Sequence, residues 1–115
     1  MSELLGIARF RFHEGKVEEY KRLSAQVMEI VTAKDSGTLQ FDIYLNDDES
    51  ECMVIERYRD SAALIEHFQN IGELSDAILA IVSVVHGEVL GEVSAELQAN
   101  LADTPVQSFG PYLSM

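Results

Sequence analysis

The sequence has no tryptophan, one cysteine and two prolines among its 115 residues, and it is poor in basic side chains. Eight Lys and Arg residues stand against twenty Asp and Glu residues, which gives a formal net charge of −12. A surface this acidic repels phosphate backbones and anionic lipid headgroups, so we expect neither a nucleic-acid partner nor a membrane partner. Solubility is the simplest explanation of the acidity.

The single cysteine, Cys52, excludes a disulfide within the chain and favours a reducing, cytoplasmic location. It begins an apolar run, which is typical of a small core residue rather than of a nucleophile. Residues 1–12 lack the basic and apolar regions of a secretory signal. The longest apolar stretch, 78–85, is too short to cross a bilayer.

Hydrophobic periodicity predicts an α+β domain. Strands are expected over 5–12, 38–45, 52–59 and 82–90, where apolar and polar side chains alternate or both faces are apolar. A long helix is expected after Gly15, and a second from Ser61 to Ala80 with a break at Gly72. The resulting order, β-α-β-β-α-β, is the split-βαβ or ferredoxin-like plan, with both helices on one face of the sheet.

The C-terminal residues extend this plan. Ser94 is suited to cap a short helix, and residues 106–113 are expected to be extended. This last segment holds several large apolar side chains and is too apolar for a free tail. We therefore divide the chain into a ferredoxin-like domain, 1–90, and an extension, 91–115, that packs on the same domain or on a partner subunit.

The expected sheet also predicts a partner. In strand 52–59, Cys52 and Val54 are opposed by Met53 and Ile55, and the last expected strand has valines on both faces. Because the helices cover only one face, the other face needs burial, which a second copy supplies through a two-fold homodimer interface. The alternative is a monomer whose own C-terminal segment covers part of that face.

Three segments carry a family pattern. Residues 10–20 (FRFHEGKVEEY) are similar to an opening strand, a glycine turn and a first helix. Residues 37–44 (GTLQFDIY) and 56–68 (ERYRDSAALIEHF) are similar to the patterns x-G-C-L-x-Y-x-x-Y and E-x-W/Y-x-s-x-e-A-L-x-x-H. Their order and spacing resemble those of the antibiotic-biosynthesis-monooxygenase family. The resemblance extends over residues 5–90 and implies a ferredoxin-like unit that pairs into a dimeric α/β barrel.

The members of this family catalyse different reactions. The positions at which this chain departs from the patterns of particular members narrow the set of reactions that we expect of it. Haem-degrading members carry an Asn, a Trp and a His where this chain has Ala8, His67 and Ala77, so haem is not expected. Quinol-oxidising and isomerase-like members have a second His at the position of Gly72. The three histidines of this chain are scattered without metal-ligand spacing, so we expect neither a metal nor an organic cofactor.

The resemblance implies that the first strand faces the second helix around an apolar pocket lined by aromatic side chains. The candidate substrate-binding residues are Phe10, Phe12, Leu64, Phe68 and Tyr44. An imidazole in such a pocket is suited to deprotonate a phenol or quinol, which makes His67 the candidate catalytic base. The alternative is a histidine that is only packed and hydrogen-bonded on a helix face.

A carboxylate among apolar neighbours needs a partner, and Glu56 shares its strand face with Val54 and Tyr58. An ion pair with Arg9 or Arg11 of the first strand is the structural interpretation, and a catalytic role is the other.

The leading functional hypothesis is a cofactor-independent monooxygenase that oxidises a small aromatic or quinol-like compound with dioxygen. A non-catalytic dimeric stress or ligand-binding protein would use the same pocket without turnover. An isomerase of a small carbonyl compound is the third hypothesis. It would need a cationic phosphate site, and none of the pocket residues named above is Lys or Arg.

Overall fold

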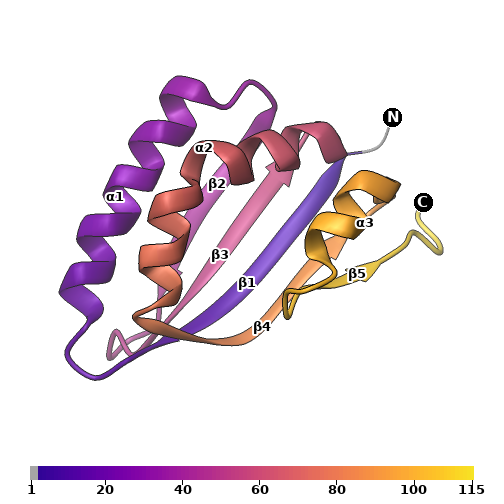
Figure 1. Cartoon of the computed structure of the whole chain (residues 1–115). Helices are drawn as coiled ribbons and strands as arrows, with labels where there is room; N and C mark the ends of the chain where they lie inside the picture. Colours follow the sequence, from indigo (N-terminus) through magenta and orange to yellow (C-terminus); the bar gives the residue numbers. More distant parts are fainter. Residues whose placement is uncertain (1–2) are drawn as a thin grey trace.

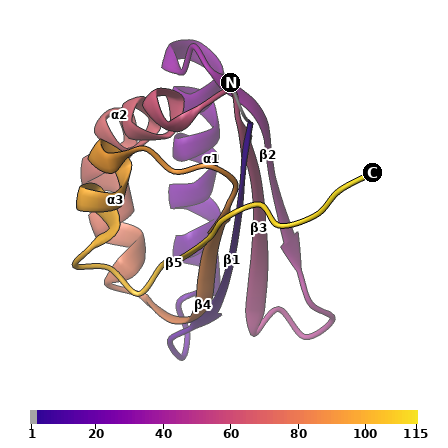
Figure 2. The ribbon, with the colours of Figure 1, turned by 90° about the vertical axis from the view of Figure 1, so that its right-hand side faces the viewer.

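The computed structural model describes residues 3–115. Its elements are β1 (Leu4–Phe12), α1 (Val17–Lys34), β2 (Thr38–Leu45), β3 (Glu51–Tyr58), α2 (Ser61–Leu79), β4 (Val82–Leu90), α3 (Ala95–Leu101) and β5 (Gln107–Phe109) (Figure 1). The strand order is β2-β3-β1-β4-β5, with β5 parallel to β4 and the other neighbours antiparallel. The helices lie on one face of the sheet (Figure 2). The expected α+β, ferredoxin-like fold is confirmed.

Both long helices bury an apolar stripe against the sheet. Gly15, with φ +76, makes the turn before α1, which buries Tyr20, Leu23, Val27 and Val31 at helical spacing. The side chain of Asp60 caps α2 by accepting a hydrogen bond from the backbone N–H of Ala63 at 2.9 Å.

The expected break at Gly72 is wrong, because α2 runs without interruption from Ser61 to Leu79. A glycine inside a helix costs about 1 kcal/mol relative to alanine, which weakens a helix without ending it. Ile71, before the glycine, packs with Val27 and Val31 of α1, and Leu74, after it, packs against the same cluster, so α2 contacts α1 on both sides of Gly72.

The register between strands decides which side chains face the helices. Residues directly opposite each other in an antiparallel pair point to the same face of the sheet. The buried residues Cys52 and Val54 of β3 lie opposite Phe10 and Ala8 of β1. Phe10 and Phe12 therefore face the helices, and they pack in one cluster with Cys52 and Val54.

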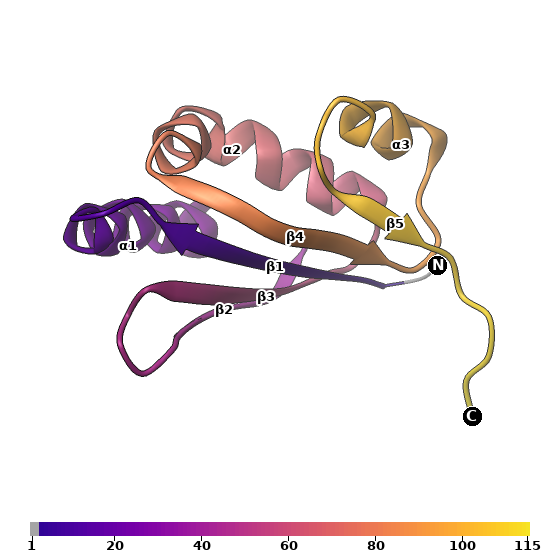
Figure 3. The same ribbon diagram turned by 90° about the horizontal axis from the view of Figure 1, so that it is seen from below.

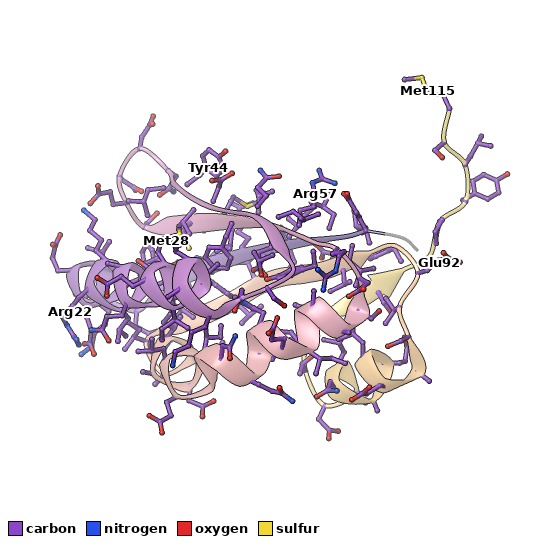
Figure 4. All side chains as sticks on the ribbon, turned by 90° about the horizontal axis from the view of Figure 1, so that it is seen from above. Arg22, Met28, Tyr44, Arg57, Glu92 and Met115 are labelled. Atoms are coloured by element: carbon purple, nitrogen blue, oxygen red, sulfur yellow. The ribbon has the colours of Figure 1, made fainter. Side chains whose placement is uncertain are left out.

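We call the opposite side of the sheet the open face. Its apolar residues are Leu5, Ile7, Tyr44, Met53, Ile55, Leu90 and Phe109. Its charged residues are Arg9, Arg11, Asp42, Glu51, Arg57, Glu88 and, next to β1, Glu3. Figure 4 shows Tyr44 and Arg57 projecting on this side, away from the helices. The open face is thus more polar than the apolar patterns of β3 and β4 alone predict, because β1 and β3 add three arginines.

Two register shifts interrupt the expected alternation. One lies between Thr38 and Gln40 in β2 and leaves Leu39 exposed, although strict alternation along 38–45 would put Leu39 on the same face as Phe41. The other lies where β1 pairs with β4, and Val85 is exposed there. Such bulges place an extra residue outside the ladder, which periodicity alone does not predict.

Residues 91–115 begin with a packed helix and end in an exposed arm. Ser94 caps α3 through a hydrogen bond from the N–H of Leu97 at 3.1 Å, and Leu97 is fully buried in a cluster with Tyr58. After Phe109 the chain leaves the body on the open-face side (Figure 3). Within residues 3–115, the helices are too short or too polar to cross a bilayer.

Candidate functional site

A buried pair of ionisable side chains joins the C-terminal end of α1 to the middle of α2. His67 of α2 is only 2% exposed, and its Nδ1 lies 2.7 Å from Oδ2 of Asp35. Asp35 ends α1 with extended backbone angles (φ −71, ψ 128), while its N–H still bonds to the carbonyl of Val31. The chain therefore leaves the helix at this residue, and its carboxyl, which is also fully buried, meets α2.

The Asp35 carboxyl receives two further hydrogen bonds. Asn70 Nδ2 donates to Oδ1 at 2.8 Å, and Thr38 Oγ1 donates to Oδ2 at 2.7 Å. Burial opposes ionisation, but the hydrogen bonds from Asn70, Thr38 and His67 outweigh it and lower the pKa of Asp35. The group is therefore a carboxylate at neutral pH. Because a carboxylate only accepts hydrogen bonds, the ring nitrogen that faces it, Nδ1 of His67, carries a hydrogen.

The other ring nitrogen of His67 is free. Nε2 has no hydrogen-bond partner among residues 3–115. In the same residues, every fully buried side-chain nitrogen or oxygen has a partner, so Nε2 lies at the small accessible part of the imidazole. In a neutral imidazole with its hydrogen on Nδ1, Nε2 holds the lone pair that accepts a proton.

Aromatic rings surround the imidazole. The ring centres of Phe41 and Tyr58 each lie 5.4 Å from the centre of the His67 ring, and that of Phe68 lies 6.2 Å away. Phe41 comes from β2 and Tyr58 from β3, so the sheet supplies two of the rings and α2 the third. These apolar faces suit a flat hydrophobic molecule.

A second acid group lies beside the pair. The Tyr58 hydroxyl donates a hydrogen bond to Oε1 of Glu56, and Glu56 lies opposite Gly6 on the helix-facing side of the sheet. Burial raises the pKa of Glu56, although the charge of His67 and the hydrogen bond from Tyr58 partly offset this effect. Burial also raises the pKa of Tyr58. Glu56 is therefore a group that retains a proton more readily than an ordinary carboxyl.

The expected ion pair between Glu56 and Arg9 or Arg11 is wrong. Both arginines bind Glu51 instead, Arg9 at 2.6 Å and Arg11 at 3.1 Å. The reason is the pleat of the sheet. Arg9, Arg11 and Glu51 lie on the open face, whereas Glu56 points to the helices.

The structure brings some of the predicted site residues together and separates others. Leu64 and Phe68 share α2 with His67, and buried Leu64 packs in the cluster of Tyr58. Phe10 and Phe12 lie four and six residues along β1 from Gly6, the neighbour of Glu56, which is about 13–20 Å at the rise of a strand. Phe12 contacts the ring of Tyr20, at 4.7 Å. Tyr44 is 57% exposed on the open face, on the other side of the sheet from His67.

Sequence reasoning missed three residues that define the site. Asp35 resembles ordinary turn chemistry in the run Asp-Ser-Gly, and Thr38 resembles a strand residue. The sequence feature that could have indicated a buried partner for His67 is Asn70. It follows His67 by three residues and so shares its face of α2. Two polar side chains at that spacing on a buried face indicate a common partner.

Two surface hollows lie elsewhere. One, of about 530 Å³, is lined by Asn46, Asp47 and Asp48 in the loop between β2 and β3. The other, of about 450 Å³, is lined by Leu90, Gly91 and residues 109–114. Neither includes a residue of the Asp35–His67 pair. Within the part of the chain that the structure describes, His, Cys, Asp and Glu side chains form no group suited to hold a metal ion.

Comparisons with known proteins agree with this architecture. The family model described as antibiotic biosynthesis monooxygenase matches residues 5–82. The search of curated protein sequences finds no relative that matches the chain. Among solved structures, MupZ from Pseudomonas fluorescens is 24% identical, with a TM-score of 0.84 over 100% of this chain and 94% of that chain. The match to MupZ therefore includes the C-terminal extension.

Other similar structures cover the ferredoxin-like part. Rv0793 from Mycobacterium tuberculosis is 24% identical, with a TM-score of 0.66 over 81% of this chain and 97% of that chain. The N63A mutant of SnoaB, described as a cofactor-independent oxygenase from Streptomyces nogalater, is 17% identical, with a TM-score of 0.66 over 77% and 91%. At identities this low, these similarities show a shared fold.

Proposed function

Because the chain belongs to the antibiotic biosynthesis monooxygenase family, we propose that it is a cofactor-independent monooxygenase acting on a small aromatic or quinol-like compound with dioxygen. The observation that carries this proposal is the buried Asp35–His67 pair, in which Nε2 of the imidazole remains free to accept a proton. The description of SnoaB as a cofactor-independent oxygenase adds support, since the two chains share a fold.

His67 is the base of the proposed reaction. Its Nε2 removes a proton from the substrate, and the Asp35 carboxylate stabilises the imidazolium that forms, as a buried carboxylate does for a neighbouring histidine. The resulting electron-rich anion transfers one electron to dioxygen, and the two radicals join through a new C–O bond. Where the reacting carbon carries a hydrogen, the O–O bond then breaks as this hydrogen leaves the carbon. One oxygen atom stays as a carbonyl, and the other leaves as water, with the hydrogen from the carbon and one further proton.

Glu56 is the acid of the proposed reaction. It lies beside the imidazole through its hydrogen bond with Tyr58, and its raised pKa favours the protonated form. The departing oxygen needs a proton at the step in which the O–O bond breaks, and Glu56 supplies it. The proton that His67 took from the substrate then passes to the Glu56 carboxylate, directly or through water. This transfer restores both groups.

The experiment is dioxygen uptake with a panel of phenols, naphthols and quinols, followed by mass spectrometry of the product under ¹⁸O₂. We expect one labelled oxygen atom in the product and one in water. His86→Ala is the matched control for substitutions at His67, because His86 lies on β4 and its imidazole pairs with Glu88 rather than with Asp35. Ligand binding without dioxygen uptake by any compound would instead favour the non-catalytic hypothesis.

We also propose that two copies pair through the open face, in a cytoplasm where Cys52 stays reduced. The open face carries three arginines and four carboxylates, a formal balance of −1 out of the −12 of the chain. Two copies therefore repel each other least when they approach through this face. Its seven apolar residues supply the surface that a stable interface buries.

A further inference from the structure

Gly6 is a buried glycine inside β1, the strand that lies between β3 and β4 in the middle of the sheet (Figure 1). A glycine inside a strand weakens it and commonly marks a bulge, a left-handed backbone or the close approach of another group. The register with both neighbouring strands is regular at Gly6, and its φ is not positive. A close approach is the explanation that remains.

Within residues 3–115, no protein group makes this close approach. A Cβ built on Gly6 would lie 3.5 Å from Cβ of Glu56 and 3.7 Å from its Oε1, and the third nearest atom, at 3.8 Å, also belongs to Glu56. These are ordinary van der Waals distances, so the fold itself has room for an alanine here. Gly37 is the opposite case, because a Cβ there would lie 2.5 Å from Cβ of Ala63. The room above Gly6 is thus left open beside the carboxyl of Glu56.

The Glu56 carboxyl has one oxygen that the protein does not use. Oε1 accepts the hydrogen bond from Tyr58, whereas Oε2 has no hydrogen-bond partner in the part of the chain that the structure describes. Every fully buried side-chain oxygen in that part has a partner, so Oε2 is accessible to a small molecule. Because burial raises the pKa of Glu56, Oε2 is the place for the carboxyl hydrogen, and this hydrogen needs an acceptor.

The room above Gly6 is narrow and has one apolar side. Gly6 lies opposite Glu56 in β3 and opposite Val89 in β4, and residues opposite each other point to the same face of the sheet. Val89 is only 5% exposed. The space of one missing side chain, with a carboxyl on one side and an apolar side chain on the other, suits a diatomic molecule better than an aromatic ring.

We propose that the room above Gly6 is the dioxygen subsite, where the outer oxygen of the peroxide accepts the hydrogen of Glu56. The inference rests on the proposed oxygenase reaction, in which Glu56 protonates the departing oxygen. That transfer requires the two oxygen atoms to approach within about 3 Å. A methyl group at Gly6 displaces the outer oxygen from the carboxyl, and a displacement of about 1 Å is enough to slow such a step.

The test compares Gly6→Ala with the native chain, using a phenol or quinol that supports dioxygen uptake. Dioxygen consumption and hydrogen peroxide release are measured at several dioxygen concentrations. When the outer oxygen does not reach the proton of Glu56, the C–O bond breaks instead of the O–O bond. Both oxygen atoms then leave together as hydrogen peroxide, with two hydrogens of the substrate.

Gly87→Ala is the matched control. Gly87 is also a buried strand glycine, and it lies opposite Ala8 on the helix-facing side of the sheet. A Cβ at Gly87 would meet Val106 at 3.5 Å rather than Glu56. Gly87→Ala should therefore keep the native dioxygen kinetics.

We expect Gly6→Ala to raise the Michaelis constant for dioxygen about 10-fold or more and to release hydrogen peroxide. The Michaelis constant for the aromatic substrate should change little, because the ring binds elsewhere in the site. The melting temperature of Gly6→Ala should equal or exceed the native value, since alanine fits and lowers the conformational freedom of the unfolded chain.

Native dioxygen kinetics in Gly6→Ala, without hydrogen peroxide, would refute the subsite and leave the oxygenase reaction standing. The same effects in Gly87→Ala would also refute it, since that position does not face Glu56. A lowered melting temperature of Gly6→Ala would show that the fold itself requires this glycine, against the argument for a ligand. Absence of dioxygen uptake by the native chain with every compound of the panel would refute the reaction and the subsite together.

Discussion

Nδ1 of His67 lies 2.7 Å from a carboxylate oxygen of Asp35, a residue 32 positions earlier in the chain. His67 lies in α2, whereas Asp35 directly follows α1, and only the packed fold brings the two side chains together. This contact fixes which ring nitrogen carries the hydrogen and thereby leaves Nε2 as the proton acceptor. The proposed role of His67 as a base depends on this contact.

The first prediction concerns Asp35→Asn, which keeps the size of the side chain and removes its charge. We expect Nδ1 of His67 to lose its fixed hydrogen, because an amide presents both a donor and an acceptor. Turnover should fall about 10²-fold or more, and the free energy of unfolding should fall by about 1–3 kcal/mol. ¹⁵N NMR of the imidazole reports the tautomer without a substrate. Asp42→Asn, on the open face, is the control and should leave the tautomer unchanged.

The second prediction is a pH dependence of stability caused by Glu56. Its pKa in the folded protein is raised, so the folded state holds the proton at pH values where the unfolded chain has released it. Glu56 therefore lowers the free energy of unfolding as the pH rises above the ordinary value of 4.5. Glu56→Gln removes this loss and keeps an acceptor for the Tyr58 hydroxyl.

Urea unfolding of the native chain and of Glu56→Gln, from pH 4 to pH 8, measures the effect. The stability of the variant relative to the native chain should increase with pH over this range. Glu73→Gln, an exposed position on α2, is the matched control. A difference that stays constant with pH for Glu56→Gln would contradict the assignment of Glu56 as the proton-holding group.

The third prediction uses two glycines that differ in their surroundings. A Cβ at Gly72, inside α2, would meet nothing within 4 Å, so Gly72→Ala should raise the free energy of unfolding by about 0.5–1 kcal/mol. A Cβ at Gly37 would lie 2.5 Å from Cβ of Ala63, so Gly37→Ala should destabilise the protein. Thermal unfolding of both variants checks the pair. Equal shifts in the melting temperature would show that the backbone preference of alanine over glycine, rather than the space available for a Cβ, determines the change in stability at these positions.

The fold was largely predictable from the sequence, because it depends on periodic patterns. Alternation located the strands, and the stripe of apolar residues in α1 located its buried face. Outside the two register shifts, the pattern predicted which residues share a face within each strand, but not which face of one strand lies beside which face of the next. For this reason, Glu56 was paired with Arg9 or Arg11, which in fact bind Glu51 on the opposite face.

The candidate site was predictable only in part. His67 stood out because a histidine on a buried helix face needs a partner. Asp35, its partner, did not stand out, because it follows a helix and resembles a residue that simply ends the helix. A contact between residues 32 positions apart leaves no local signal in the sequence. The direction of residues 110–115 was also not predictable, since their apolar side chains indicate a packed segment but not the side on which it leaves the body (Figure 3).

The most direct test of the account compares His67→Ala with the native chain in two measurements on the same protein, dioxygen-dependent turnover and the free energy of unfolding. We expect turnover to fall by about 10²–10⁴-fold, the usual contribution of a general base, with the His86→Ala control unaffected. The variant should remain folded, since alanine is a strong helix former, although Asp35 loses one of its hydrogen bonds. A variant that loses stability yet keeps native turnover would show that His67 only holds the helices together, and would contradict its assignment as the catalytic base.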